Sequence, residues 1–383
     1  MRKKLLRISI VQPYLPHYAA AFLEKLTHAQ SIERIQVIAD LESAGHLNAV
    51  NQAGALELTH VPYISRNGFV FRPGRFRALH AYQPDICVLS GDPRDFGGIF
   101  LAVFLRALGH KVVFWGMFHR IGGARLVSQI AYMLMAKVSN ACITYARIGA
   151  LNLLSLGARA EKVFVGGTAI DESKPFEAAT EVRPHEIEAF KSEHGLLGRA
   201  LILQIVRLSR IKKPLLVLEL ARILRERGRD DFVIVIIGGG EMFEAFRDRA
   251  EELHLLDVVH ILPPEYEEAR LARWFLSADI FTIPTCIGLS AHHAFSYGVP
   301  IVTDDSMTDQ ASEFEAITNG LNGLTYRTGD IQDYADAVEM ILDDPALRER
   351  MSRNAFDTIR NNYNVATKVA AFERVFSQFA EAE

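Results

Sequence analysis

The chain has 383 residues, 49% of them hydrophobic, and a formal net charge of −4 at pH 7. The length favours two domains, and the slightly acidic charge argues against a nucleic-acid partner, which would need a basic face. Three widely separated cysteines predict neither a disulfide framework nor a zinc site. Because no run of about 18 apolar residues occurs, we expect a cytoplasmic protein that could still touch a membrane surface.

Short apolar runs alternate with helical patterns through the first half of the chain. Helices are predicted at Tyr18–Thr27, Gly97–Leu108 and Arg125–Val138. The strands expected around them are Leu6–Gln12, Arg34–Ala39, Glu57–Val61, Asp85–Ser90, Lys111–Trp115, Ala141–Tyr145 and Lys162–Val165. This alternation indicates a parallel sheet covered by helices.

A charged, proline-bearing stretch follows, and then the alternation restarts. The strands expected in the second half are Ala200–Val206, Phe232–Ile237, Val258–Leu262, Asp279–Ile283 and Pro300–Thr303. The fold class predicted is therefore α/β, with two Rossmann-like domains facing a cleft. The expected division is an N-terminal domain (1–175), a linker and lead-in helix (176–197), a C-terminal domain (198–360) and a final helix packing back on the N-terminal domain (361–383).

Ligands of open parallel sheets bind outside the carboxyl ends of the strands, and this rule selects a few stretches. In "VRLSRIKKP", Arg207 and Lys212 follow a strand and could hold a diphosphate. A solvated basic loop is an equally good interpretation. In "IIGGGE", Gly239, Gly240 and Glu241 follow the next strand; glycine allows close backbone approach to an anion, although many such turns need glycine only for their geometry.

The stretch "IPTCIGLSAHHAFSYGVPIVT" contains a strand, a turn, a helix and a second strand. The turn amides of Gly288, Leu289 and Ser290 could point at a phosphate or sugar oxygen at the helix start. His293 could hydrogen-bond a ligand hydroxyl. Because adjacent helical residues point about 100° apart, at most one histidine of the pair can face a cleft, and a packed or surface histidine is the commoner case.

Two further groups carry polar side chains at expected strand ends. In "DQASEFEAITNGLNGLTY", Glu313 and Glu315 could bind sugar or ribose hydroxyls, or could merely favour a helix start. From the first half, the residues expected near one rim, where an acceptor hydroxyl could be held, are His17, Asp92, Arg94, His119 and Arg120.

The second half resembles family 4 glycosyltransferases, which have the GT-B fold. The resemblance covers roughly 125 residues and is carried by "VRLSRIK", "IGGGE", "IPTCIGLSAHHAFSYGVP", and Glu315 ahead of "NGLNG". Where the family usually has two glutamates eight apart, this chain has Thr285 and His293. The first of these glutamates contacts the donor sugar and the second the ribose; a bacterial polysaccharide-assembly subgroup is similar in having histidine at the second position.

The resemblance implies a retaining, metal-independent glycosyltransferase of bacterial surface polysaccharide synthesis. The donor would be a UDP- or GDP-sugar bound mostly by the C-terminal domain, and the acceptor a glycan or lipid-linked molecule met by the N-terminal domain. Neither a cofactor nor a metal ion is expected. Arg207, Lys212 and His119 are the expected catalytic residues. A sugar-nucleotide epimerase or hydrolase on the same fold, or a degenerate transferase acting as a scaffold, are the alternatives.

Contact with the cytoplasmic face of the inner membrane is a further expectation. The helix Arg125–Ala141 is apolar with a few cations, and another loop carries Phe69, Phe71, Arg72, Arg75 and Arg77. Apolar and basic side chains together can hold a protein on an anionic surface. Packing of the helix into the core is the alternative.

Overall fold

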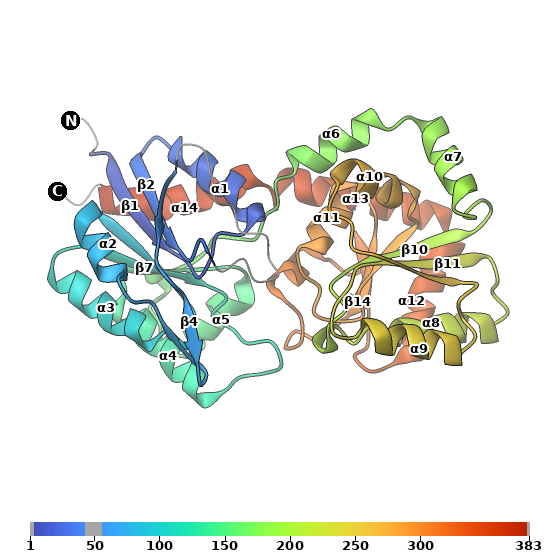
Figure 1. Ribbon diagram of the computed structural model, residues 1–383, viewed down its shortest axis with the longest axis horizontal. Coiled ribbons are helices and arrows are strands. Elements are labelled where there is room, and N and C mark those ends of the chain that lie inside the picture. Colours follow the sequence, from blue (N-terminus) through green and yellow to red (C-terminus); the bar gives the residue numbers. More distant parts are fainter. Residues whose placement is uncertain (1–3, 43–55, 381–383) are drawn as a thin grey trace. The chain divides into compact units, whose positions relative to one another are not determined.

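A computed structural model describes residues 4–42 and 56–380 (Figure 1). The chain divides into two compact units. Unit 1 consists of Met1–Asp171 and Val365–Glu383, and unit 2 of Glu172–Asn364. The division after Asp171 falls four residues before the expected one.

Unit 1 contains a parallel sheet with the strand order β3-β2-β1-β6-β7-β8-β9. Its strands are β1 (Leu6–Val11), β2 (Ile32–Ala39), β3 (Glu57–His60), β6 (Ile86–Ser90), β7 (Lys111–Gly116), β8 (Ala141–Thr144) and β9 (Val163–Val165). An antiparallel hairpin of β4 (Ile64–Arg66) and β5 (Phe69–Phe71), which the sequence did not predict, lies outside this sheet. The helices are α1 (His17–Thr27), α2 (Arg75–Tyr82), α3 (Phe96–Ala107), α4 (Leu126–Val138), α5 (Arg147–Ser155), the 3-10 turn η1 (Ala160–Lys162) and α14 (Val365–Ala380).

Helices cover both faces of the unit 1 sheet (Figure 1). On one face α14 packs beside α1, and Phe372 lies edge-on to Phe22 and Trp115 with ring centroids 4.9 and 5.0 Å away. On the other face α3 and α4 pack side by side. The last helix of the chain thus completes a core begun by the first.

Unit 2 repeats this plan with the strand order β12-β11-β10-β13-β14-β15, all parallel. Its strands are β10 (Ala200–Ile205), β11 (Phe232–Ile237), β12 (Val259–Leu262), β13 (Ile280–Thr282), β14 (Ile301–Asp304) and β15 (Gly323–Tyr326). Its helices are α6 (Ser173–Glu181), α7 (Pro184–Glu193), α8 (Leu215–Glu226), α9 (Phe243–Glu252), α10 (Glu268–Ser277), α11 (Ser290–Ser296), α12 (Ile331–Asp343) and α13 (Pro345–Asn361), with the 3-10 turns η2 (Arg210–Lys212) and η3 (Ser312–Ala316).

Apolar runs in the sequence predicted the strands correctly because the strands are buried on both faces of the sheet. Every residue of β11, Phe232–Ile237, is buried, as expected for a central strand of a sheet covered on both sides. The α/β class with two Rossmann-like units is confirmed. Residues 176–197, expected to form a linker and a lead-in helix, contain the end of α6 and all of α7, and both helices pack on α10. Strand β15 was not predicted, because Asn322-Gly323 is typical of a turn and only Leu324, Thr325 and Tyr326 separate it from Arg327.

No helix in the described part of the chain is both long and apolar enough to cross a bilayer.

Candidate functional site

At the carboxyl edge of the unit 2 sheet, the loops after β10 and β11 interlock. The Leu208 amide donates to the Gly239 carbonyl at 2.8 Å, and the Met242 amide donates to the Leu208 carbonyl at 3.0 Å. A Cβ on Gly238, whose φ is +155°, would lie 1.8 Å from the Val206 carbonyl oxygen. Gly240 is constrained in the same way, with a Cβ 2.4 Å from the Leu208 oxygen. The packing of the two loops by itself therefore explains these glycines.

Glu241 follows this loop and has a structural contact of its own. Its side chain is exposed, and its Oε1 accepts a hydrogen bond from the Arg210 amide at 3.0 Å. Gly239 is less constrained than its neighbours, because an added Cβ would meet only Pro264, at 3.4 Å. Of the three residues predicted here, Gly239 is the one with room for a ligand.

Lys212 and Arg207 lie in the loop after β10 but in different surroundings. The Lys212 Nζ donates to the Cys286 carbonyl at 2.7 Å, which ties η2 to the turn after β13. Burial lowers the pKa of Lys212, and the neighbouring Cys286 and Glu313 oppose that shift. Arg207 is exposed and makes no hydrogen bond or ion pair with the residues of 4–42 and 56–380. Lys212 is therefore held by the protein itself, whereas the Arg207 side chain is available to contact a ligand.

A buried glutamine, Gln310, links the turn after β13 to the end of β14 by hydrogen bonds. Gln310 accepts from the Ile287 amide at 2.8 Å and donates to Thr303 Oγ1 and Asp304 Oδ1, both at 2.9 Å. Cys286 adopts the left-handed conformation, with φ of +54°, which is uncommon for a residue other than glycine and marks a constrained turn. The turn is thus built as a rigid piece.

The top of the same turn leaves backbone donors available. Within the described residues, the amides of Gly288, Leu289 and Ser290 donate no hydrogen bond. A Cβ on Gly288 would meet nothing within 4 Å, and its φ is not left-handed. Gly288 is therefore required neither by backbone conformation nor by packing. Helix α11 has only seven residues, so any dipole contribution at its start is small.

The two histidines of α11 have separate environments. His292 is fully buried, with its ring 5.3 Å from that of Tyr363. His293 is half-buried, and its Nε2 lies 2.6 Å from Glu268 Oε1. The Tyr297 hydroxyl donates to the same Oε1 at 2.6 Å. Burial would raise the pKa of Glu268, but the hydrogen bonds from His293 and Tyr297 outweigh it, so that the pKa is lowered.

Glu268 was not among the residues expected in the site. It stands at the start of α10, 25 positions from His293, in a stretch where "EYEEAR" offers several acids without distinguishing one. The contact depends on side chains of α10 and α11 meeting in the folded unit, as Phe275 also meets His293 and Tyr297, and nothing in the local sequence specifies it. A carboxylate is therefore present next to the position where the family has one, but it comes from another helix.

Thr285 is fully buried and lies beside Asp304, which ends β14. Burial raises the pKa of Asp304, and contact with Thr285 together with hydrogen bonds from Ser306 and Gln310 limits that rise. Glu313 and Glu315 are both half-buried in η3, and Glu313 acts on the charge of Lys212. The acidic group nearest the fixed lysine is thus Glu313 rather than Glu315.

In unit 1, four of the five expected rim residues gather around Tyr132. The charges of Asp92, Arg120 and Arg94 all act on its phenol, and the Tyr132 hydroxyl donates to the His119 carbonyl at 3.3 Å. Burial raises the pKa of Tyr132 to about 12. Asp92 and Arg94 form an ion pair at 2.7 Å. The fifth residue, His17, begins α1, but its side chain lies outside the described part of the structure.

His119 is 93% buried, with Nδ1 3.2 Å from the Met117 carbonyl. His119 was expected to be catalytic, but its buried ring is poorly accessible to a substrate in this structure.

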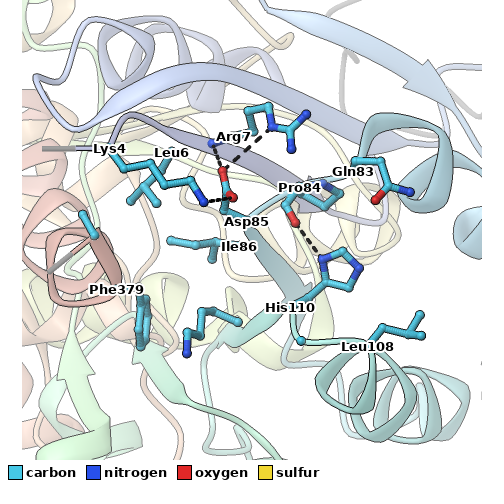
Figure 2. A pocket seen from close by; sticks show the side chains of 13 residues that line it. Lys4, Leu6, Arg7, Gln83, Pro84, Asp85, Ile86, Leu108, His110 and Phe379 are labelled. Atoms are coloured by element: carbon cyan, nitrogen blue, oxygen red, sulfur yellow. Dashed lines mark hydrogen bonds and ion pairs between the residues drawn. The ribbon is translucent and has the colours of Figure 1, made fainter. Parts of the chain in front are cut away.

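A cavity of about 350 Å³ lies at the opposite, amino edge of the unit 1 sheet (Figure 2). Asp85 accepts from the Arg7 amide at 2.8 Å and pairs with Lys4 at 3.1 Å, while His110 Nδ1 lies 2.7 Å from the Pro84 carbonyl. These polar groups are already partnered. Because ligands of parallel sheets bind at the carboxyl ends, this cavity is not the candidate site.

Two Rossmann-like units with this edge geometry define the GT-B class of α/β proteins. Residues 186–358, all within unit 2, match the family model described as glycosyl transferases group 1. D-inositol 3-phosphate glycosyltransferase of Pseudarthrobacter chlorophenolicus is 33% identical over 180 residues, which are 45% of this chain and 41% of that protein. The chain thus spans about two fifths of the length of that curated relative.

Solved structures match along nearly the whole chain. HepE of Anabaena in complex with UDP superposes with a TM-score of 0.73 at 14% identity, covering 98% of this chain and 100% of the other. A glycosyltransferase of Rickettsia africae superposes with a TM-score of 0.75 at 13% identity, covering 99% and 100%. These likenesses establish the fold of both units.

Proposed function

We propose that the protein is a retaining glycosyltransferase that moves a sugar from a UDP- or GDP-sugar to a glycan or lipid-linked acceptor in bacterial surface polysaccharide synthesis. The observation that carries the proposal is the turn after β13. Within the described residues, the backbone amides of Gly288, Leu289 and Ser290 donate no hydrogen bond, and the carbonyl of Cys286 in the same turn accepts from Lys212 Nζ. The group 1 family domain in the same unit and the UDP bound by the Anabaena neighbour support it.

The chemistry follows from charge development. The bond between the anomeric carbon and the diphosphate oxygen breaks, and negative charge builds on the departing diphosphate. Lys212, Arg207 and the amides of Gly288–Ser290 would stabilise that charge; donors fixed in advance are often the largest catalytic term. Because these groups supply the positive charge, the proposal needs no divalent metal. The acceptor hydroxyl attacks the face that the leaving group vacates, which retains the anomeric configuration.

The ribose of the donor would meet the pair formed by His293 and Glu268. A ribose diol can donate to a carboxylate and accept from an imidazole N–H. Glu268 can accept from one ribose hydroxyl, and the His293 ring nitrogen that does not face Glu268 can exchange a hydrogen bond with the other. Thr285 supplies a hydroxyl where the family's other glutamate contacts the sugar, with Asp304 beside it.

The acceptor would meet unit 1, where Asp92, Arg94, Arg120 and His119 gather around Tyr132. We expect the protein to work in the cytoplasm in peripheral contact with the inner membrane, where lipid-linked acceptors are found.

Titration calorimetry and turnover assays test the proposal. The wild-type chain should bind a UDP- or GDP-sugar, and Arg207→Ala and Lys212→Ala should each lower kcat on the order of 100-fold. Arg210→Ala is the matched control, because this exposed arginine lies in the same loop and its role there is carried by the backbone amide. Normal turnover in both Arg207→Ala and Lys212→Ala would remove the diphosphate assignment.

The same assays separate the alternatives. Donor consumption without an acceptor would indicate an epimerase or hydrolase. No binding of any sugar nucleotide at millimolar concentration would instead favour a degenerate transferase acting as a scaffold, a possibility motivated by the absence of both family glutamates at Thr285 and His293.

A further inference from the structure

An exposed apolar surface covers the outer side of unit 1. Phe100 on α3 and Leu126 on α4 are each 77% exposed, and Phe104 and Val127 beside them are at least half exposed. The β4–β5 hairpin adds Phe69 and Phe71. We call these six residues the apolar face.

The members of the apolar face form one continuous patch. Helices α3 and α4 pack side by side, as Figure 1 shows, and α3 also packs on β5. Phe69 lies 6.0 Å from Phe96 at the start of α3, measured between ring centroids. Exposed apolar residues scattered singly are normal, whereas a contiguous patch indicates an interaction site.

Core packing does not account for these residues. Ile99, Ala102 and Leu105 fill the inward side of α3, and Ala131 and Met135 do so for α4. Both helices therefore already bury one side in the sheet. The apolar face is a second apolar side, and it remains exposed.

The segment of the chain that carries the apolar face is strongly basic. Residues 61–160 contain twelve arginines and lysines but three acids, a net charge of +9, although the whole chain has −4. The acids are all engaged: Asp85 with Lys4, Asp92 with Arg94, and Asp95 with Arg75. The sequences of α2, α3 and α4 contain no acid.

Four exposed cations lie on α3, on α4 and on α2, whose Phe76 contacts Phe104 of the apolar face. Arg77 belongs to α2, Arg106 to α3, and Arg125 and Lys137 to the two ends of α4. The loop cations Arg72 and Arg75, expected at a membrane surface, are instead buried against Asp95. The basic component thus comes mainly from the helices.

We propose that the apolar face and its surrounding cations form a docking surface for an anionic lipid bilayer. Apolar side chains that enter the acyl boundary and cations that meet anionic headgroups are the two contributions that hold a protein on such a surface. A second copy of the chain fits poorly, because two surfaces of this charge would repel each other. Such docking would bring the protein to a lipid-linked acceptor, and its functional role therefore rests on the proposed function.

Vesicle co-sedimentation of the full chain tests the proposal, with no donor present. The wild type should sediment with vesicles of phosphatidylglycerol and phosphatidylcholine in equal parts, and much less with pure phosphatidylcholine. Phe100→Glu combined with Leu126→Glu should reduce binding at least about tenfold by removing buried apolar area. Arg77→Gln and Arg125→Gln should each reduce it about fivefold, and salt should weaken the wild type.

Leu256→Glu is the matched control, because Leu256 is 47% exposed but lies in unit 2. It should bind vesicles like the wild type, and unchanged thermal melting should show that every variant is folded. Equal sedimentation of the wild type and the double variant, or no wild-type binding to anionic vesicles, overturns the proposal. A dimer in light scattering that the double variant dissociates also overturns it, in favour of an interface between copies. Donor binding in calorimetry is a separate measurement, so either proposal can fail alone.

Discussion

The two units share a parallel sheet covered by helices, but they differ at the edge where ligands bind. In unit 2 the buried Gln310 and the interlocked glycine loops fix the backbone. Among the residues that the structure describes, Arg207 forms no side-chain hydrogen bond or ion pair and the turn amides donate no hydrogen bond. In unit 1 the charged residues of the edge, such as Asp92 and Arg94, pair with each other. The topology therefore specifies the edge, whereas the local packing decides which polar groups are available to a ligand.

The glycine loop gives the largest expected effect. Gly238→Ala forces a Cβ against the Val206 carbonyl in a backbone conformation that only glycine tolerates, so unit 2 should lose at least about 3 kcal/mol of stability. Denaturant unfolding measures this loss. Gly288→Ala is the matched control and should unfold like the wild type, because its added Cβ meets nothing within 4 Å. Equal stability of both variants would contradict the interlocked-loop account.

The next effect concerns the pH dependence that Lys212 should confer. Burial lowers the pKa of Lys212, so its ammonium loses a proton at a lower pH than an ordinary lysine does. If the charged form binds the diphosphate, kcat/KM should fall on the alkaline side at a pH below the usual lysine pKa, since this ratio reports the free enzyme. Lys212→Arg should move that limb upward, because arginine stays charged. An unmoved limb would exclude Lys212 as its origin.

The pair formed by His293 and Glu268 can be tested by a double-mutant cycle. His293→Glu restores the family residue but sets it against Glu268, and we expect a loss of about 2 kcal/mol in stability. Adding Glu268→Gln should recover most of that loss, because an amide can donate to the new carboxylate. Thermal melting of the four proteins measures the coupling. Purely additive effects would mean that the two side chains do not interact.

The smallest effect is expected at Gly288 itself. Because the protein does not need this glycine, Gly288→Ala should leave the fold intact but weaken binding of the donor about tenfold, or 1.4 kcal/mol, by crowding the amides. Calorimetry with the donor identified for the wild type measures it. Unchanged affinity would move the diphosphate away from this turn.

The sequence predicted the strands well because the central strands are buried on both faces and read as apolar runs, as in Phe232–Ile237. It missed the β4–β5 hairpin, in which Phe69 and Phe71 are exposed and only Val70 is buried. The net charge of −4 also suggested that the protein lacks a basic face, although residues 61–160 alone carry a net charge of +9. A chain average conceals opposite charges on different segments.

The candidate site was predicted only in part. Loops that follow strands identify the edge, so Lys212 and the turn at Gly288 could be selected from sequence order. Glu268 and Gln310 could not be selected, because Glu268 contacts His293 from 25 residues away and Gln310 contacts Ile287 from 23 residues away, and these segments meet only in the folded unit. His119 was selected for its position after a strand, but its side chain is buried, which the local sequence does not reveal.

The return of α14 to unit 1 has a consequence for biosynthesis. Phe372 and Phe376 complete the core around Phe22 and Trp115, but the ribosome makes them only after all of unit 2. Domains generally fold as they emerge, the first one first. Unit 2 is a continuous segment, whereas unit 1 is built from residues on both sides of it, so the hydrophobic interior of unit 1 can close only after Val365–Ala380 have been made.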